Sequence, residues 1–321
     1  MSCLHIVYAT DSRYLFPTAV AAGSAVLHAG DRSRIAIDIL DCGLSDAEWS
    51  AFAANFRHRL GTDFALTRHA VDMRAYDSLK AWHTSRGIYA RLDIPQILKD
   101  EPWCVYADGD TLFTADPLKL ADVFDPACAI MGHLDDNVDI PWYAEHGFRL
   151  HPETQICAGF ILLNLDWFRA NEGTRKCFDL LNRFPDMPYN DQDALNIVCE
   201  GKIGVLPDNW GKFTYDTNRE TVPGLFHYVS DRPWELKANG FLPLRGTDVI
   251  WYRVKDRAVG GGAHSCPTTT QLRYFHVWAK TALVKSAVSV LNVLPGLRGR
   301  FTRNLRRAWS EGFVRRFLPQ R

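Results

Sequence analysis

Two aspartates separated by one glycine follow an apolar segment of the chain. Asp108-Gly109-Asp110 comes directly after WCVYA, residues 103–107, and the apolar TLF follows it. Two carboxylates on one short turn, with nothing bulky between them, can face the same hard divalent cation. Such an ion can bridge a pyrophosphate and neutralise the charge on a leaving nucleotide diphosphate. The same Asp-x-Asp pattern also occurs in solvent-exposed acidic turns. An acidic pair between two apolar segments, however, favours a functional site.

The spacing of the apolar residues predicts the elements that position these aspartates. Residues 103–107 are predicted to form a buried strand, so the aspartates lie at its carboxyl end. Earlier elements alternate in type: strand 4–9, helix 17–28, strand 34–40, and helix 46–60 with Ser45 as N-cap. This alternation favours an α/β fold with a mainly parallel central sheet flanked by helices. Ligands bind at the carboxyl ends of the strands in open sheets of this kind.

The later part of the chain divides at a run of glycines. Before it, the pattern predicts a largely helical segment at 85–99, apolar runs at 128–132 and 158–165, and a helix from Asp191 to Cys199. Three consecutive glycines, residues 260–262, disfavour regular structure. We therefore predict three parts: a main domain over 1–252, a connector over 253–270 and two basic amphipathic helices over 271–321.

The composition is that of a globular protein. Apolar residues make up 47% and charged residues 23% of the 321 residues, which excludes a disordered or fibrous chain. Basic and acidic residues balance at 37 each, yet residues 273–321 hold eleven Lys or Arg and one acid. Eight cysteines without a CxxC pair indicate reduced thiols. No signal peptide and no run of the ~20 apolar residues of a membrane span is visible, which predicts a cytoplasmic protein.

Five segments, in this order, resemble glycosyltransferase family 8, the family of lipopolysaccharide galactosyl- and glucosyltransferases and of glycogenin. They are HIVYATDSRY, GIYARLDIPQIL, WCVYADGDTLF, CAGFILLNLDWFR with YNDQDALN, and FHYVSDRPW. The resemblance covers residues 4–234. It implies a GT-A nucleotide-diphospho-sugar transferase fold and a retaining, metal-dependent transfer from a UDP-sugar donor. The implied cofactor is Mn²⁺, with Mg²⁺ as the alternative.

The resemblance also implies a ligand set for the metal ion. Asp108, Asp110 and His227 match the metal ligands of the family. A neutral imidazole suits Mn²⁺, and its borderline softness adds selectivity over Mg²⁺. Without the motif, a buried structural histidine would be the preferred interpretation of His227.

The first of the five segments, HIVYATDSRY, is implied by the resemblance to bind the nucleotide. Asp11 resembles the residue that reads the uracil edge, and the backbone of Ala9 and Thr10 would line the same pocket. The alternative for Asp11 is a helix N-cap. Gly109 would approach the donor as part of the acidic turn.

Two arginines are implied to contact the donor. Arg91 would reach its phosphate or sugar with a planar fork of donors, or else form a surface ion pair with Asp93. Arg232 stands where the family usually has lysine and would contact the diphosphate. The stretch from His227 to Arg232 is one residue shorter than in the family and lacks its glycine, which bears on a phosphate contact by Ser230.

A group of acids and an amide is implied to surround the sugar ring. Asp135, Asp191 and Gln192 match it, with Gln192 nearest the anomeric carbon. Because an amide is a poor nucleophile, front-face attack by the acceptor hydroxyl, with the departing phosphate as base, is favoured over a covalent carboxylate intermediate. The alternative for 191–193 is an acidic helix start. Cys157 stands where the family commonly has asparagine.

The implied reaction is transfer of galactose or glucose to a saccharide or lipid-linked acceptor such as lipopolysaccharide. The basic and aromatic residues of 271–321 predict peripheral contact with an anionic membrane at its inner face rather than nucleic-acid binding; packing on the protein is the structural alternative. Three other functions fit less well: a glycogenin-like self-glycosylating protein, a catalytically silent nucleotide-sugar-binding scaffold, and a metal-dependent phosphohydrolase, which would normally have more His and Asp ligands.

Overall fold

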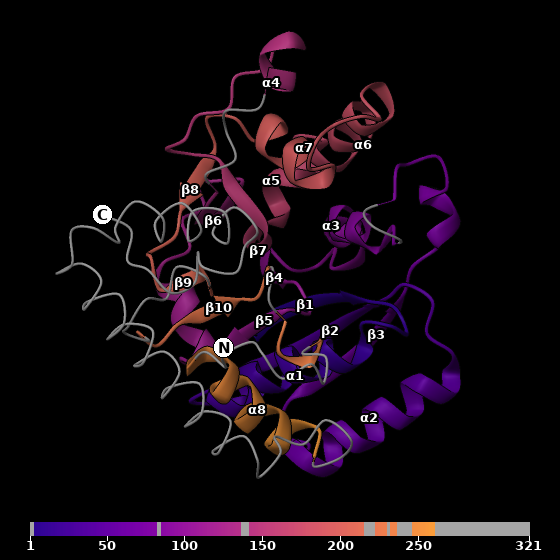
Figure 1. Cartoon of the computed structure of the whole chain (residues 1–321), viewed down its shortest axis with the longest axis vertical. Helices are drawn as coiled ribbons and strands as arrows, with labels where there is room; N and C mark the ends of the chain where they lie inside the picture. The colour runs from indigo at the N-terminus through magenta and orange to yellow at the C-terminus, as the bar shows by residue number, and fades with distance from the viewer. Residues whose placement is uncertain are drawn as a thin grey trace, which may run out of the picture. The chain divides into compact units, whose positions relative to one another are not determined.

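A sheet of seven strands lies at the centre of the computed structural model (Figure 1). The structure describes residues 3–81, 85–135, 141–214, 222–229, 232–235 and 246–260. In spatial order the strands are β3 (Ala65–Ala70), β2 (Ile35–Asp41), β1 (Leu4–Thr10), β4 (Trp103–Ala107), β7 (Ile156–Asn164), β6 (Ile130–Leu134) and β8 (Ile203–Val205). β7 runs antiparallel to both of its neighbours and the other pairs are parallel. The predicted α/β class is confirmed, with a mixed, mostly parallel sheet.

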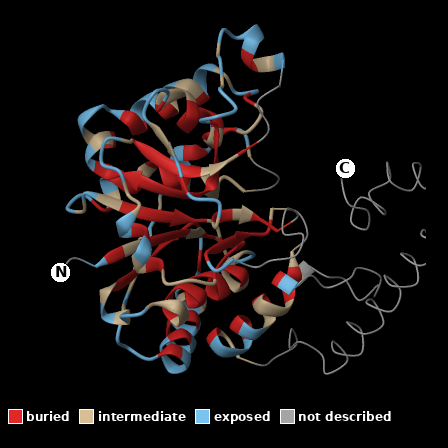
Figure 2. Ribbon diagram, turned by 90° about the vertical axis from the view of Figure 1, so that its left-hand side faces the viewer, coloured by how far each residue is buried: buried red, intermediate tan, exposed pale blue. Residues whose placement is uncertain are grey.

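Helices cover both faces of this sheet. One layer packs together α1 (Leu15–His28), α2 (Asp46–Leu60) and α8 (Gly246–Ala258). The other contains α3 (Ile94–Ile97), α5 (Leu165–Ala170), α6 (Gly173–Arg183) and α7 (Asp191–Val198). Successive strand residues point to opposite faces, so Tyr8 belongs to the core cluster that includes Phe56 of the first layer, while its neighbour Val7 belongs to the cluster that includes Phe168 of the second. Figure 2 shows the strands of this sheet as mostly buried.

The remaining helical elements are short. They are helix α4 (Pro141–Glu145) and the 3₁₀ segments at Arg32–Arg34, Met73–Tyr76, Gly87–Asp93, Pro117–Asp122 and Pro233–Glu235. Within the described ranges, no helix combines the length and hydropathy needed to cross a bilayer.

Most predicted boundaries agree with the structure to within two residues. Helix α2 spans the predicted 46–60, and Ser45 caps it with a full capping box in which Glu48 returns the hydrogen bond. The largely helical segment predicted at 85–99 is present over 87–97, as a 3₁₀ segment at Gly87–Asp93 and a one-turn helix at Ile94–Ile97 with Pro95 in its first turn. One predicted boundary was wrong. Residues 253–258 belong to α8 rather than to the connector, because Trp251, Val254 and Ala258 pack inward. The predicted helices over 271–321 lie outside the described residues.

A second, three-stranded sheet adjoins the end of β4. It has the order β5 (Thr111–Phe113), β10 (Leu225–His227) and β9 (Trp210–Phe213). β10 is antiparallel to β5 and pairs His227 with Thr111, and the amide of Tyr228 donates to the carbonyl of Asp110 at 2.8 Å. This pairing brings the distant His227 beside the acidic turn.

A buried carboxylate between two histidines links the first three strands. Asp38 on β2 is 3% exposed and lies 2.8 Å from His5 Nδ1 on β1 and 2.7 Å from His69 Nε2 on β3. The hydrogen bond to Asp38 raises the pKa of His5 above 6.5. Burial alone would raise the pKa of Asp38, but its hydrogen bonds to His5 and His69 outweigh burial and lower it.

Replacing His5 with glutamine should therefore destabilise the protein more in mild acid than in mild base. A group whose folded pKa is raised contributes stability that is complete below its unfolded pKa and lost as the pH rises through the folded pKa. We expect the loss to be larger by about 1 kcal/mol at about pH 5.5 than at about pH 8.5, measured by urea unfolding. The exposed His58→Gln is the control. An equal loss at both pH values would show that the charge of His5 contributes nothing.

Candidate active site

Three possible metal ligands meet where the two sheets join. Asp108 and Asp110 lie on the turn between β4 and β5, and His227 is the last residue of β10. One ligand atom from each lies within 4.8 Å of the others. Their mixture of carboxylate oxygen and imidazole nitrogen suits a hard or borderline divalent cation.

Each of the two carboxylates is held by its own set of donors. Asp108 Oδ1 accepts hydrogen bonds from Tyr106 Oη at 2.6 Å and from Arg91 Nη2 at 2.9 Å. Asp110 Oδ2 accepts one from Tyr14 Oη at 3.0 Å, and Arg232 Nη2 lies 3.6 Å from it. These contacts engage one oxygen of each carboxylate, and the other oxygen of Asp110, Oδ1, lies 3.2 Å from His227 Nε2.

Asp110 Oδ1 fits the position of a metal ligand. It is fully buried and accepts no hydrogen bond from the described residues, although His227 Nε2 lies 3.2 Å away. A buried carboxylate oxygen needs a cation beside it, which either a protonated His227 or a bound metal ion can supply. The three residues therefore fit a divalent ion on chemical grounds.

The charges of this group depend on one another. Burial raises the pKa of Asp108, although Arg91 opposes the shift. Burial alone would also raise the pKa of Asp110, but His227 and Arg232 outweigh it and hold that pKa low. For His227 burial acts to lower the pKa, yet Asp110 raises it well above 6.5. Because a metal ligand must be a neutral imidazole, binding of a cation would release a proton from this histidine.

Two glycines make the close packing of the site possible. A Cβ on Gly159 of β7 would lie 2.2 Å from His227 Cε1 and 2.8 Å from Asp108 Oδ2. A Cβ on Gly109 would lie 2.3 Å from Thr18 Oγ1 and 2.9 Å from Tyr14 Cδ1. The first glycine leaves room for the ligands, and the second lets the acidic turn lie against the first turn of α1.

A known family accounts for most of the chain. The profile described as "Glycosyl transferase family 8" matches residues 5–236. The chain belongs to glycosyl transferase family 8.

Individual relatives agree with this family. Glycosyltransferase GlyB of Streptococcus pneumoniae serotype 4 is 24% identical over 186 residues, 52% of this chain and 42% of that protein, so this chain spans less than half of GlyB. General stress protein A of Bacillus subtilis is 22% identical over 256 residues, covering 72% of this chain and 87% of that protein. The structure of galactosyltransferase LgtC with donor and acceptor sugar analogs superposes with a TM-score of 0.67 at 21% identity, over 81% and 98% of the two chains. This likeness shows that the fold is shared.

Gln192 occupies a fixed position in this family 8 site. Its Oε1 accepts from the amide of Ala158 at 3.0 Å, and its Nε2 donates to Asp135 Oδ2 at 2.9 Å. A backbone N–H requires an oxygen and a carboxylate requires a donor, so the two partners fix which way the carboxamide points. Engagement of Oε1 with a donor further weakens it as a nucleophile.

The two acids beside Gln192 have different partners. Asp191 Oδ2 lies 3.0 Å from Arg91 Nε, and burial raises the pKa of Asp191 to about 6. Asp193 accepts from Tyr143 Oη at 2.8 Å and from the amide of Tyr189 at 2.8 Å. Asp193 is therefore a structural residue at the start of α7, while Asp191 belongs to the network around the metal group.

The structure shows different partners for Arg91 than the surface pair offered as an alternative, and it shows which groups Asp11 binds. Arg91 is 5% exposed and pairs with Asp108 and Asp191, so the surface pair with Asp93 was wrong; Asp93 accepts from Tyr76 instead. Asp11 accepts from the amides of Arg13 and Tyr14 at 3.0 Å each and so does cap the turn before α1.

The backbone of Ala9 and Thr10 ends β1 beside that turn, and the carbonyl of Thr10 is engaged by the amide of Cys42 at 2.9 Å. Ser230 lies outside the described residues.

Three side chains contact the metal group without having been predicted to do so. Tyr14 and Tyr106 each donate to one of its carboxylates, and Cys157 Sγ lies 3.8 Å from His227 Nδ1. Both tyrosines lie inside family segments, HIVYATDSRY and WCVYADGDTLF, which was the available signal. Cys157 was noted as a departure from the family, without its contact to His227.

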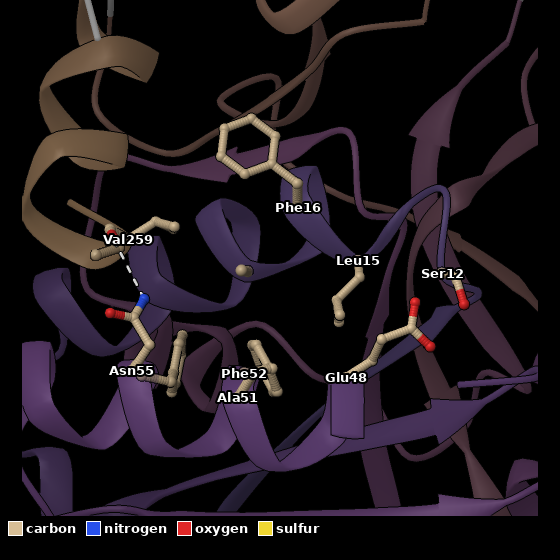
Figure 3. Close-up of a pocket in the computed structure, with 11 residues that line it drawn as sticks. Ser12, Leu15, Phe16, Glu48, Ala51, Phe52, Asn55 and Val259 are labelled. Atoms are coloured by element: carbon tan, nitrogen blue, oxygen red, sulfur yellow. Dashed lines mark hydrogen bonds between the residues drawn. The ribbon is translucent and has the colours of Figure 1, made fainter. Parts of the chain in front are cut away.

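A separate pocket of about 320 Å³ opens between α1 and α2 (Figure 3). Leu15, Phe16 and Phe52 form its apolar walls, and the last turn of α8 closes one end, where Asn55 Nδ2 donates to the carbonyl of Val259 at 3.2 Å. The residues that line it include none of the metal group, so it is distinct from the candidate active site.

Proposed function

We propose that this protein transfers a hexose, galactose or glucose, from a UDP-sugar to a saccharide acceptor of the glycolipid or lipopolysaccharide type, with retention of anomeric configuration. The observation that carries the proposal is the group of Asp108, Asp110 and His227 at the carboxyl end of β4. A divalent ion, Mn²⁺ in our proposal, would supply Lewis-acid neutralisation of the leaving diphosphate. Membership in family 8 supports the reaction class.

The residues around the metal group support a division of roles. Arg232, which is 27% exposed and lies beside Asp110, would receive the diphosphate, since an arginine fork suits phosphate oxygens. The buried Arg91 holds Asp108 and Asp191 in position through an ion pair with each. Asp135 and Gln192 would orient the donor sugar.

The position of Gln192 supports front-face substitution. Because the carboxamide oxygen already accepts from the amide of Ala158, we propose that the acceptor hydroxyl attacks on the face from which the diphosphate departs. The hydroxyl proton then passes to the departing phosphate oxygen. The predicted peripheral attachment through residues 271–321, at the inner face of a membrane, remains a prediction.

The proposal predicts that UDP binding depends on both the ion and Asp110. We expect calorimetric titration of UDP to give tight binding with Mn²⁺, and at least about hundredfold weaker binding without it or in Asp110→Asn, because a lost metal ligand leaves the diphosphate charge uncompensated. The exposed Asp179→Asn on α6 should bind like the unmodified protein. Equal binding of UDP without Mn²⁺ and Asp110, or no binding at all, would contradict the proposed function.

A further inference from the structure

Cys157 faces the imidazole ring of the candidate metal ligand His227. Its Sγ lies 3.8 Å from His227 Nδ1, while His227 Nε2 lies 3.2 Å from Asp110 Oδ1. The two ring nitrogens therefore have different partners, since Nε2 faces the metal group and Nδ1 faces the sulfur. Among the residues that the structure describes, Sγ is the hydrogen-bonding partner of Nδ1.

The backbone on both sides of Cys157 is held by side chains of α7. The carboxamide of Asn196 accepts from the amide of Ile156 and donates to the carbonyl of the same residue, both at 2.9 Å. The amide of Ala158 donates to Gln192 Oε1 at 3.0 Å. Cys157 itself is buried. Because both of its neighbours are held, β7 sets the direction of the cysteine side chain independently of the ring that it contacts.

The other contacts of the His227 ring cannot decide which nitrogen carries a proton. Phe213 lies 5.8 Å away between ring centres. Gly159 lies so close that an added Cβ would be 2.2 Å from Cε1. These contacts limit where the ring can lie, but neither supplies an acceptor at Nδ1.

A metal-binding histidine needs an acceptor for its second nitrogen. When the ion is bound through Nε2, a neutral imidazole carries its proton on Nδ1. A partner that accepts this proton in a hydrogen bond fixes the tautomer and the orientation of the ring. A cysteine sulfur is a weak acceptor, yet it can fill this role.

We propose that Cys157 is a positioning residue of the metal site: its sulfur accepts a hydrogen bond from His227 Nδ1 and so fixes Nε2 as the nitrogen that binds the divalent ion. The inference rests on the proposed function for the role of His227 as a metal ligand. It gives a role to the position at which the family commonly has asparagine, whose side-chain oxygen is also an acceptor.

Two substitutions of Cys157 separate the acceptor from the volume that it fills. Cys157→Ser keeps an acceptor, whereas Cys157→Val fills the space without one. Mn²⁺ is titrated by the electron paramagnetic resonance signal of the free ion. We expect Cys157→Val to bind Mn²⁺ about tenfold or more weakly than the unmodified protein, and Cys157→Ser to bind it more tightly than Cys157→Val. Urea unfolding should give the reverse order of stability, because serine buries a more polar group than valine.

Opposite orders of metal affinity and stability support the positioning role. If Cys157→Val binds Mn²⁺ as tightly as the unmodified protein, or more tightly than Cys157→Ser, the inference is overturned, since the cysteine then acts through its volume. The buried Cys199 lies outside the metal group and is the matched control, so Cys199→Ser and Cys199→Val should both leave the affinity for Mn²⁺ unchanged.

A separate titration of UDP at saturating Mn²⁺ distinguishes failure of this inference from failure of the proposed function. An unmodified protein that binds Mn²⁺ but not UDP contradicts the proposed function, and the order of the two Cys157 variants for Mn²⁺ still decides the inference. An unmodified protein that binds no Mn²⁺ contradicts both.

Discussion

Gly159→Ala is expected to weaken Mn²⁺ binding by at least about tenfold, because the new methyl group would occupy the space of two candidate ligands. Its Cβ would lie 2.2 Å from His227 Cε1, 2.8 Å from His227 Nε2 and 2.8 Å from Asp108 Oδ2. The strand cannot retreat easily, since the carbonyl of Gly159 accepts from the amide of Asp108 at 2.8 Å and the next residue, Phe160, pairs with Ala107. The imidazole must move. Overpacking should also cost about 1 to 3 kcal/mol in stability.

Two further variants separate the loss of the metal site from general strain. Gly132→Ala places a Cβ 2.7 Å from Ile156 Cδ1 in the same sheet, so it should lower the melting temperature without affecting Mn²⁺ binding. The cost of Gly159→Ala in stability should be smaller when it is introduced into His227→Ala than into the unmodified protein, because the ring with which the new methyl clashes most closely is gone. Normal Mn²⁺ affinity in Gly159→Ala would refute the packing argument.

Arg91→Met is expected to have the largest effect on stability, a loss of about 3 to 5 kcal/mol. Methionine matches much of the volume but leaves the buried carboxylate of Asp191 and the partly exposed carboxylate of Asp108 without the guanidinium that pairs with both. The variant also loses the donor to the carbonyl of Ala158 and the cation over the Tyr106 ring, 4.4 Å away. Burial already raises the pKa of Asp191 to about 6, so removal of Arg91 should raise it further. Stability should therefore fall more steeply as the pH rises through neutrality, which urea unfolding at several pH values measures.

The matched control for Arg91 is an arginine with two exposed partners. Arg175 pairs with Glu172 and Asp179 on the surface of α6, and Arg175→Met should leave the free energy of unfolding almost unchanged. Adding Asp191→Asn to Arg91→Met should recover part of the loss, since it removes one of the uncompensated charges. Similar effects of the two arginine variants would show that burial of the Arg91 pairs does not matter.

The strands and helices with clear periodicity could be predicted from the sequence, but the small sheet could not. β1 and β4 have continuous apolar patterns, and α2 has an amphipathic pattern with a recognisable N-cap. β5 and β10 have three residues each, too few for a period to be visible. The sheet that brings His227 to Asp110 could therefore not be predicted from the pattern of residues. His227 was predicted as a metal ligand only from the resemblance to the family.

Residue type indicated the candidate ligands, while the contacts that support them depend on tertiary structure. Asp108 and Asp110 were found because carboxylates on an apolar background are unusual. Tyr14 and Tyr106 were not, because a tyrosine in an apolar segment is ordinarily a core residue. Whether its hydroxyl meets a carboxylate depends on how a helix start or a strand lies against the acidic turn.

The pairing of β10 with β5 has a consequence for synthesis of the protein. Residues 108 and 110 leave the ribosome long before Leu225–His227, so a nascent chain that ends before β10 carries two of the three candidate ligands and lacks the strand that covers the acidic turn. Such a chain can build β1, β2 and β4 but holds two neighbouring carboxylates without their imidazole partner. Affinity for a divalent ion should then arise late, when the last strand closes onto β5, and would mark completion of the fold.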